Sequence, residues 1–65
     1  MKTYKLYVNM PSGKFYADVV ANSCKNKKGR LTFFKDNSNK HLPMIRVASY
    51  PSQYTIIEKI IENEN

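Results

Sequence analysis

Apolar and polar positions alternate in the first third of the chain with the period of two that is typical of β-strands. In residues 3–10 the positions of one face are all apolar or aromatic, namely Tyr4, Leu6, Val8 and Met10. The same alternation recurs in residues 14–22, where one face consists of Phe15, Ala17, Val19 and Ala21. Because Pro11-Ser12-Gly13 between them is typical of a turn, the two stretches predict a β-hairpin.

Two registers are compatible with this hairpin. A type I turn with a bulge at Gly13 would pair Met10 with Lys14 and would place Leu6 opposite Asp18. A two-residue turn at Ser12-Gly13 pairs apolar residues throughout: Met10 with Phe15, Val8 with Ala17 and Leu6 with Val19. We favour the second register because it keeps one face of the hairpin apolar.

The middle of the chain predicts two further strands. Residues 22–29 are polar and end in Gly29, which is typical of a loop. Residues 30–36 then place Leu31 and Phe33 on the core face, where we expect them to pair with Ala21 and Val19 respectively. After a turn at 37–40 and Pro43, residues 44–50 form the next expected strand. Its two faces are Ile45 and Val47 on one side, and Met44, Arg46, Ala48 and Tyr50 on the other.

The C-terminal segment is ambiguous between helix and strand. The four isoleucines lie at the i, i+1, i+4 and i+5 positions of one helical stripe: Ile56, Ile57, Ile60 and Ile61. Ser52 would cap a helix over residues 53–62. The β-branched residues would also suit a final short strand that closes a barrel. We favour the helix, and we expect residues 63–65 to fray.

The pattern as a whole predicts a mostly β fold, a small antiparallel meander or SH3-like barrel of four to five strands with a short C-terminal helix or final strand. It resembles small SH3-like barrels and other β-meander proteins of phages or mobile elements. The stretches that carry this resemblance are the Gly13 turn, residues 17–19, residues 29–34 and residues 45–50. The resemblance implies binding through an exposed face or loop and implies no particular activity.

The length and the cysteine count predict a small domain that needs support. The 65 residues form one β-rich domain, residues 1–65, with a small core. Cys24 is the single cysteine and His41 the single histidine, so we expect no disulfide within the chain, no metal site and no cofactor. We therefore expect a homo-oligomer. The start of the chain has no apolar signal-peptide region and no stretch could span a membrane, so we expect a cytoplasmic protein without a membrane partner.

The charge distribution favours phosphate-bearing or acidic partners. The net charge is +6, and the acidic residues concentrate in the last eight positions, while residues 1–57 hold ten basic and two acidic residues. Lysine outnumbers arginine and isoleucine and asparagine are frequent, which indicates an AT-rich genome of a bacterium, phage or plasmid. A plainer interpretation is that the lysines serve solubility and protect strand edges.

Two groups of side chains are candidates for nucleic-acid binding. The first would contact phosphates and consists of Lys25, Lys27, Lys28, Arg30 and Lys35. The second would stack on bases and consists of Tyr7, Tyr16 and Phe34, all expected off the core face. The same aromatic residues could instead be covered by the isoleucine stripe or form a subunit interface.

These observations predict a non-enzymatic, small basic binding module, encoded by a phage or mobile element, that binds nucleic acid weakly and without sequence preference. We expect no catalytic residue, because Cys24 and His41 fall in separate loops and Asp18 and Asp36 are isolated. One alternative is an accessory or inhibitor protein that binds a host protein through its aromatic β face. Another is an oligomeric binder of a small anionic ligand.

Overall fold

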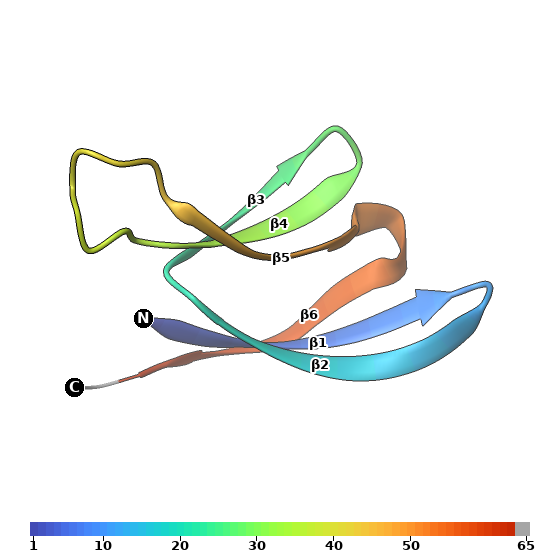
Figure 1. The fold of residues 1–65 in the computed structure, drawn as a ribbon. Coiled ribbons are helices and arrows are strands. Elements are labelled where there is room, and N and C mark those ends of the chain that lie inside the picture. The colour runs from blue at the N-terminus through green and yellow to red at the C-terminus, as the bar shows by residue number, and fades with distance from the viewer. Residues whose placement is uncertain (64–65) are drawn as a thin grey trace.

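Two three-stranded antiparallel sheets make up the fold (Figure 1). The computed structural model describes residues 1–63. Sheet A has the strand order β2-β1-β6, and sheet B has the order β3-β4-β5. The elements are β1 (Lys2–Met10), β2 (Gly13–Ala21), β3 (Ser23–Lys27), β4 (Arg30–Lys35), β5 (Ile45–Pro51), the 3-10 turn η1 (Ser52–Tyr54) and β6 (Thr55–Glu62). The prediction of a mostly β fold is confirmed, but the strands form two separate sheets and the barrel is not closed.

The two sheets pack against each other over a core of six buried side chains. Five come from sheet A and one from sheet B, and together they are Tyr4, Leu6, Val8, Val19, Ala21 and Phe33. Phe33 has 0% of its surface exposed. Its ring lies 5.0 Å from that of Tyr4 in β1 and 6.4 Å from that of Tyr50 in β5, measured between centroids. The Phe33 side chain therefore joins the inner faces of both sheets.

The first hairpin forms, but in a register that differs from both of those considered. Leu6 pairs with Ala17 and Met10 pairs with Gly13, so the central turn residues are Pro11 and Ser12. The predicted pair of Leu6 with Val19 is wrong by two residues. The period of two nevertheless leaves every side chain on its predicted face.

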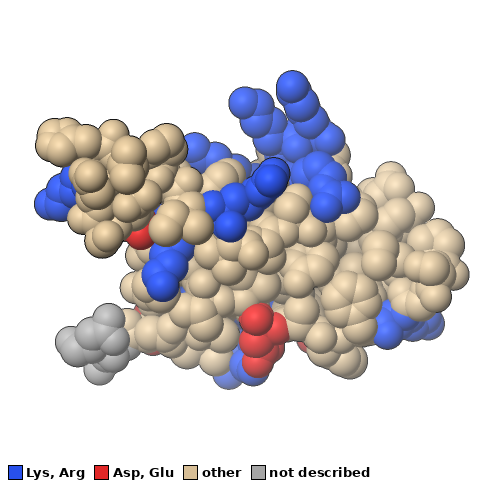
Figure 2. All heavy atoms as spheres, viewed as in Figure 1, with Lys and Arg blue, Asp and Glu red and all other residues tan. Residues whose placement is uncertain are grey.

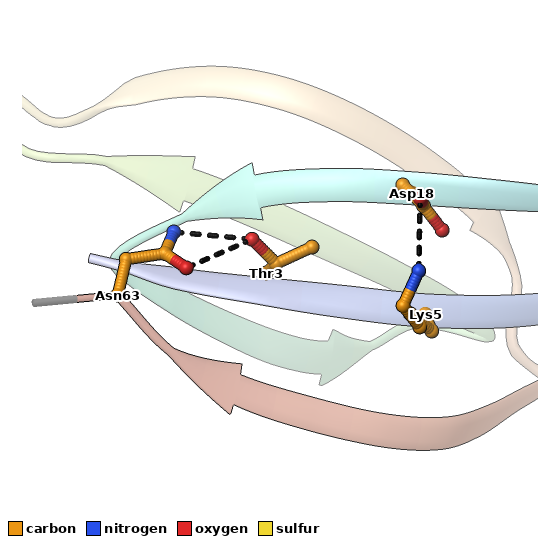
Figure 3. A network of polar contacts seen from close by, with 4 residues as sticks. All are labelled: Thr3, Lys5, Asp18 and Asn63. Atoms are coloured by element: carbon orange, nitrogen blue, oxygen red, sulfur yellow. Dashed lines mark hydrogen bonds and ion pairs between the residues drawn. The ribbon is translucent and has the colours of Figure 1, made fainter.

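Two cross-strand contacts account for this register. It places Lys5 directly opposite Asp18, and Lys5 Nζ lies 3.2 Å from Asp18 Oδ2 (Figure 3). It also places Tyr7 opposite Tyr16, with their ring centroids 4.9 Å apart. Opposite-charge pairs and aromatic pairs each stabilise an antiparallel ladder by about 0.2–1 kcal/mol.

The chain passes from sheet A to sheet B at Asn22. The Asn22 backbone N–H donates to the carbonyl of Phe34 over 2.8 Å, and the Asn22 side-chain oxygen accepts from the Asp36 N–H, also over 2.8 Å. These bonds hold a corner between β2 and β3. Residues 23–27, expected to be part of a loop, are therefore a strand that pairs with β4.

This corner also overturns the expected pairing of residues 19–21 with β4. Phe33 pairs with Cys24 of β3 and not with Val19, while Leu31 pairs with Asn26 and not with Ala21. The turn between β3 and β4 consists of Lys28 and Gly29, with φ angles of 53° and 73°. A two-residue hairpin of type I′ requires positive φ at both central positions.

Strand β5 begins after Pro43 as expected, but a bulge alters its faces. Phe33 pairs with Ala48 and Phe34 pairs with Arg46, so Val47 has no partner on β4. Because the extra residue reverses the alternation, Arg46 does not share the inner face with Ala48. The expectation that these two side chains lie on one face is therefore wrong.

The C-terminal segment is a strand, so the predicted helix over residues 53–62 is wrong. Strand β6 pairs with β1, placing Ile57 opposite Leu6 and Ile60 opposite Tyr4. Glu58 is an extra residue at a bulge, which brings Ile57 and Ile60 to the inner face although they are three positions apart. The isoleucine spacing that is typical of a helix thus also fits a bulged strand, and β-branched residues favour the strand.

The end of β6 is held against the start of β1. The Asn63 backbone N–H donates to the Met1 carbonyl over 2.9 Å, and the Asn63 amide group donates to Thr3 Oγ1 over 3.0 Å (Figure 3). The expected fraying is therefore wrong for Asn63, and residues 64–65 lie outside the described residues.

Replacing the Phe33 ring tests whether it is the main contact between the sheets. Phe33→Ala should lower the free energy of unfolding by about 3–5 kcal/mol, because it leaves a cavity between two packed layers. Urea unfolding followed by circular dichroism measures the effect. Val20→Ala, on the exposed side of β2, should cost less than about 1 kcal/mol. Equal losses in the two variants would show that Phe33 has no special role.

Candidate functional site

An open cleft lies on the outer face of sheet B, the side turned away from sheet A. Its volume is about 790 Å³. Its lining comprises five cations, two hydroxyl groups and one aromatic ring: Lys25, Lys27, Lys28, Arg30, Arg46, Thr32, Ser49 and Phe34.

Strand alternation brings these residues to one face. On β4, Phe33 points into the core, so its neighbours Thr32 and Phe34 point outward. On β3, Lys25 pairs with Thr32 and Lys27 pairs with Arg30. Cross-strand partners share a face, and both lysines therefore join the outward row of β4.

Strand β5 contributes to the cleft next to β3 and β4, and a bulge in β5 brings two of its side chains to the same face. Ser49 pairs with Thr32 on one side of Val47, and Arg46 pairs with Phe34 on the other. Without the extra residue, Arg46 and Ser49 would point to opposite faces of the sheet. The bulge therefore adds a fifth cation to the cleft.

Arg30 is held in place by β5. Its Nε donates to Ser49 Oγ over 3.1 Å, and one terminal nitrogen donates to the Ser49 backbone carbonyl, also over 3.1 Å. The hydroxyls of Ser49 and Thr32 lie 3.3 Å apart. A guanidinium carries five N–H donors, so these two bonds leave donors that can contact a ligand.

Phe34 is the aromatic element of the cleft. Its ring is partly exposed, and Lys25 Nζ lies 6.0 Å from the ring centroid. That distance is at the outer limit of a cation–π contact, which at an exposed site contributes about 0.5–1 kcal/mol. The arrangement combines a flat apolar surface with a cation directly above it.

The acidic residues of the strands all lie in sheet A, whereas basic residues lie in both sheets. The strands of sheet B contain no aspartate or glutamate, whereas those of sheet A carry Asp18, Glu58 and Glu62. Both ion pairs among residues 1–63 lie within sheet A, joining Lys5 to Asp18 and Lys2 to Glu62. Figure 2 shows Lys and Arg side chains gathered over the β3–β4 hairpin. The cleft is therefore the centre of a positive field.

The structure brings together only part of the set predicted from sequence. Lys25, Lys27, Lys28, Arg30 and Phe34 all line the cleft. Lys35, at the end of β4, does not. Tyr7 and Tyr16 lie on sheet A, on its outer face and away from the cleft, where Tyr16 is 73% exposed. Sequence reasoning missed Thr32, Arg46 and Ser49. The alternation along β4 could have indicated Thr32, but nothing in the sequence marks the β5 bulge.

The thiol and the imidazole do not form a recognisable catalytic pair. Cys24 lies in β3 and packs against the core, whereas His41 is exposed in the β4–β5 loop. Burial raises the pKa of the Cys24 thiol, which disfavours the reactive thiolate. Among residues 1–63, no cluster of three His, Cys, Asp or Glu side chains could hold a metal ion. The same residues include no helix of the length and apolar character needed to cross a membrane.

Comparison of the chain with known protein families, curated proteins and solved structures finds no match. The resemblance to small phage proteins therefore stays a prediction, and the geometry and charge of the cleft are the guide to function.

The raised pKa of Cys24 predicts slow alkylation of the folded protein. Because less thiolate forms at a given pH, iodoacetamide should react more slowly with the folded chain than with the chain in denaturant. The midpoint of the rate against pH should also lie higher for the folded chain. Mass spectrometry of timed samples measures both. Identical rates and midpoints would contradict the partly buried position of the thiol.

Proposed function

We propose that this protein is a non-enzymatic module that binds single-stranded nucleic acid, weakly and without sequence preference, through the cleft on sheet B. The supporting observation is the composition of that cleft, in which five cations, two hydroxyls and an aromatic ring converge with no acidic residue in the lining. Proteins that bind single strands without reading sequence combine a basic groove for the backbone with aromatic side chains for the bases.

The cations would act on the phosphates in two ways. Arg30 is fixed by Ser49 and offers its remaining donors in a defined direction, which suits the two oxygens of one phosphate. Lys25, Lys27 and Lys28 are exposed on flexible stems and would follow the backbone as point charges. Contacts of this kind position a strand but carry no sequence information.

The Phe34 ring would receive a base. A base stacked there would take the place of Lys25 above the ring and would leave that ammonium group close to the adjoining phosphate. Only an unpaired base presents its face in this way, so we expect single strands to bind more tightly than duplexes. Stacking accepts every base, so we expect binding without sequence preference.

A second candidate function is docking on a protein through sheet A. The Tyr7–Tyr16 ring pair and Ile56, which lies opposite Tyr7, form an exposed apolar and aromatic patch on its outer face. Tyrosine is enriched in protein interfaces. Binding through this patch would depend little on salt, whereas phosphate contacts weaken steeply as salt rises.

A small anionic ligand is a third candidate. The cleft volume of about 790 Å³ falls within the range of small-molecule sites, and its cations suit a phosphorylated compound. Displacement of a bound oligonucleotide by inorganic phosphate at low concentration would favour this candidate over the first.

Reversing two charges in the cleft tests the proposal. Lys25→Glu with Lys27→Glu should weaken binding similarly for all oligonucleotide sequences. It should also flatten the slope of log affinity against log salt by about one unit for each phosphate that is no longer neutralised. Fluorescence anisotropy with labelled DNA and RNA strands measures both quantities.

The matched control is Lys14→Glu with Lys40→Glu, which changes the net charge equally but lies outside the cleft. A similar decrease in affinity in both double variants would assign binding to overall charge, and no binding at low salt would refute the proposal.

Removing the Phe34 ring tests stacking separately from charge. Phe34→Ala should weaken single-strand binding by about 1–3 kcal/mol and leave the salt slope unchanged, because every cation is retained. Tyr16→Ala is the comparison, since that ring is more exposed but lies on the other sheet. If Tyr16→Ala weakens binding and Phe34→Ala does not, the bases lie on sheet A and the cleft is not the binding site.

A further inference from the structure

Strand β6 is an edge strand of sheet A (Figure 3). It pairs with β1 along one edge, and no strand among residues 1–63 pairs with its other edge. A free edge presents a row of backbone donors and acceptors that can pair with another strand. Two of its isoleucines remain half exposed, Ile56 at 59% and Ile60 at 51%. Ile60 is exposed although it lies opposite the buried Tyr4, so the apolar inner face of sheet A is open to solvent at this edge.

The sequence of β6 is complementary to its own reversal. The central six residues read Ile-Ile-Glu-Lys-Ile-Ile, with one acid and one base at the centre and two isoleucines on each side. When two such strands run antiparallel about this centre, Glu58 lies opposite Lys59 and Lys59 lies opposite Glu58. Ile57 then meets Ile60, and Ile56 meets Ile61.

The bulge at Glu58 makes this register consistent with the two faces of the sheet. In this register Ile57 pairs with Ile60, three positions further along the sequence. Paired residues must point to the same face of a sheet, but residues three positions apart in a regular strand point to opposite faces. The extra residue places Ile57 and Ile60 together on the inner face, opposite Leu6 and Tyr4. It likewise places Ile56 and Ile61 on the outer face, opposite Tyr7 and Thr3. Self-pairing therefore joins inner residues to inner residues and outer residues to outer residues.

Neighbouring registers lack this match. Shifting the pairing by one residue in either direction puts Glu58 opposite itself or Lys59 opposite itself, and like charges directly opposite each other are destabilising. Neither Glu58 nor Lys59 takes part in the two ion pairs among residues 1–63, so both charges remain available.

The other three edges are less suited to self-pairing. Strands β3 and β5 carry cations and no acid, so two copies would repel each other. On β2 the single acid, Asp18, already pairs with Lys5. Charge complementarity thus singles out β6.

We propose that two copies of this chain associate through their β6 strands, about a two-fold axis between Glu58 and Lys59 of each strand. Sheet A then becomes one continuous six-stranded sheet with the order β2-β1-β6-β6-β1-β2. Each Glu58 faces Lys59 of the partner subunit, and each Ile60 is covered by Ile57 of the partner subunit. The interface is isologous, as in most homodimers. This inference does not depend on the proposed binding of nucleic acid.

Charge reversal at the centre of β6 tests the proposal by sedimentation equilibrium. The wild-type chain should dimerise at micromolar concentrations. Lys59→Glu makes both central pairs acid–acid and Glu58→Lys makes both base–base, so each single variant should weaken dimerisation by about tenfold or more. The double variant Glu58→Lys with Lys59→Glu restores opposite charges and should dimerise like the wild type.

Mixing the two single variants is a sharper form of the same test. A strand with two acids and a strand with two bases are complementary, so the equimolar mixture should form a heterodimer that neither variant forms with itself. Thermal unfolding checks that each variant folds, and Lys59→Glu should fold well because it places an acid opposite Lys5 of β1.

Two outcomes would overturn the proposal. A wild-type chain that stays monomeric at high micromolar concentration would show that the bulge and the charges protect the edge from pairing. A dimer that Lys59→Glu leaves unchanged would place the interface elsewhere, with the Tyr7–Tyr16 face as the alternative surface.

Discussion

The whole structure depends on the position of the Phe33 ring between the two sheets. It is the one buried side chain that sheet B contributes to the core, and its ring packs near those of Tyr4 and Tyr50. Because side chains alternate along a strand, the inward position of Phe33 sets the outward positions of Arg30, Thr32 and Phe34. The packing of Phe33 in the core therefore also determines which side chains of β4 line the cleft. In so small a domain, core and candidate site cannot vary independently.

The concentration of cations around the cleft of sheet B lowers the stability of the fold, and an anionic ligand would offset that loss. In sheet A, Asp18 and Glu62 neutralise neighbouring lysines, whereas in sheet B five cations surround one cleft without a carboxylate among the lining residues. Like charges gathered in this way repel each other and destabilise the folded state. The hydrogen bonds from Arg30 to Ser49 offset part of that repulsion. An anionic partner would relieve the rest, so the feature that lowers stability is also the one that favours binding.

In the first hairpin, the sequence predicts which side chains share a face but not how the two strands are paired. The inward set of the first hairpin was predictable from alternation, but a shift of two residues preserves that alternation and leaves Leu6 opposite Ala17. Neither bulge was predicted, because an extra residue in a strand breaks the alternation from which the faces are predicted. The extra residue at Glu58 gives a strand the spacing of a helix, and the one at Val47 moves Arg46 to the cleft. Strand β3 was missed because it is polar except at Cys24, as suits an edge strand with a solvent-facing side.

The two surfaces proposed as interfaces lie on different sheets and can act together. A dimer joined through β6 extends sheet A and leaves the outer face of sheet B uncovered in both copies. Each dimer would then present two basic clefts to the same nucleic-acid strand. Once one cleft is occupied, the second meets the strand at a high effective concentration, so two weak sites can bind tightly without any new contact. This gain requires that one strand can span both clefts, because the avidity disappears when the geometry forbids simultaneous binding. Strand length is then the decisive variable: affinity should rise steeply once an oligonucleotide is long enough to reach the second cleft, and the charge-reversed monomer should show no such rise.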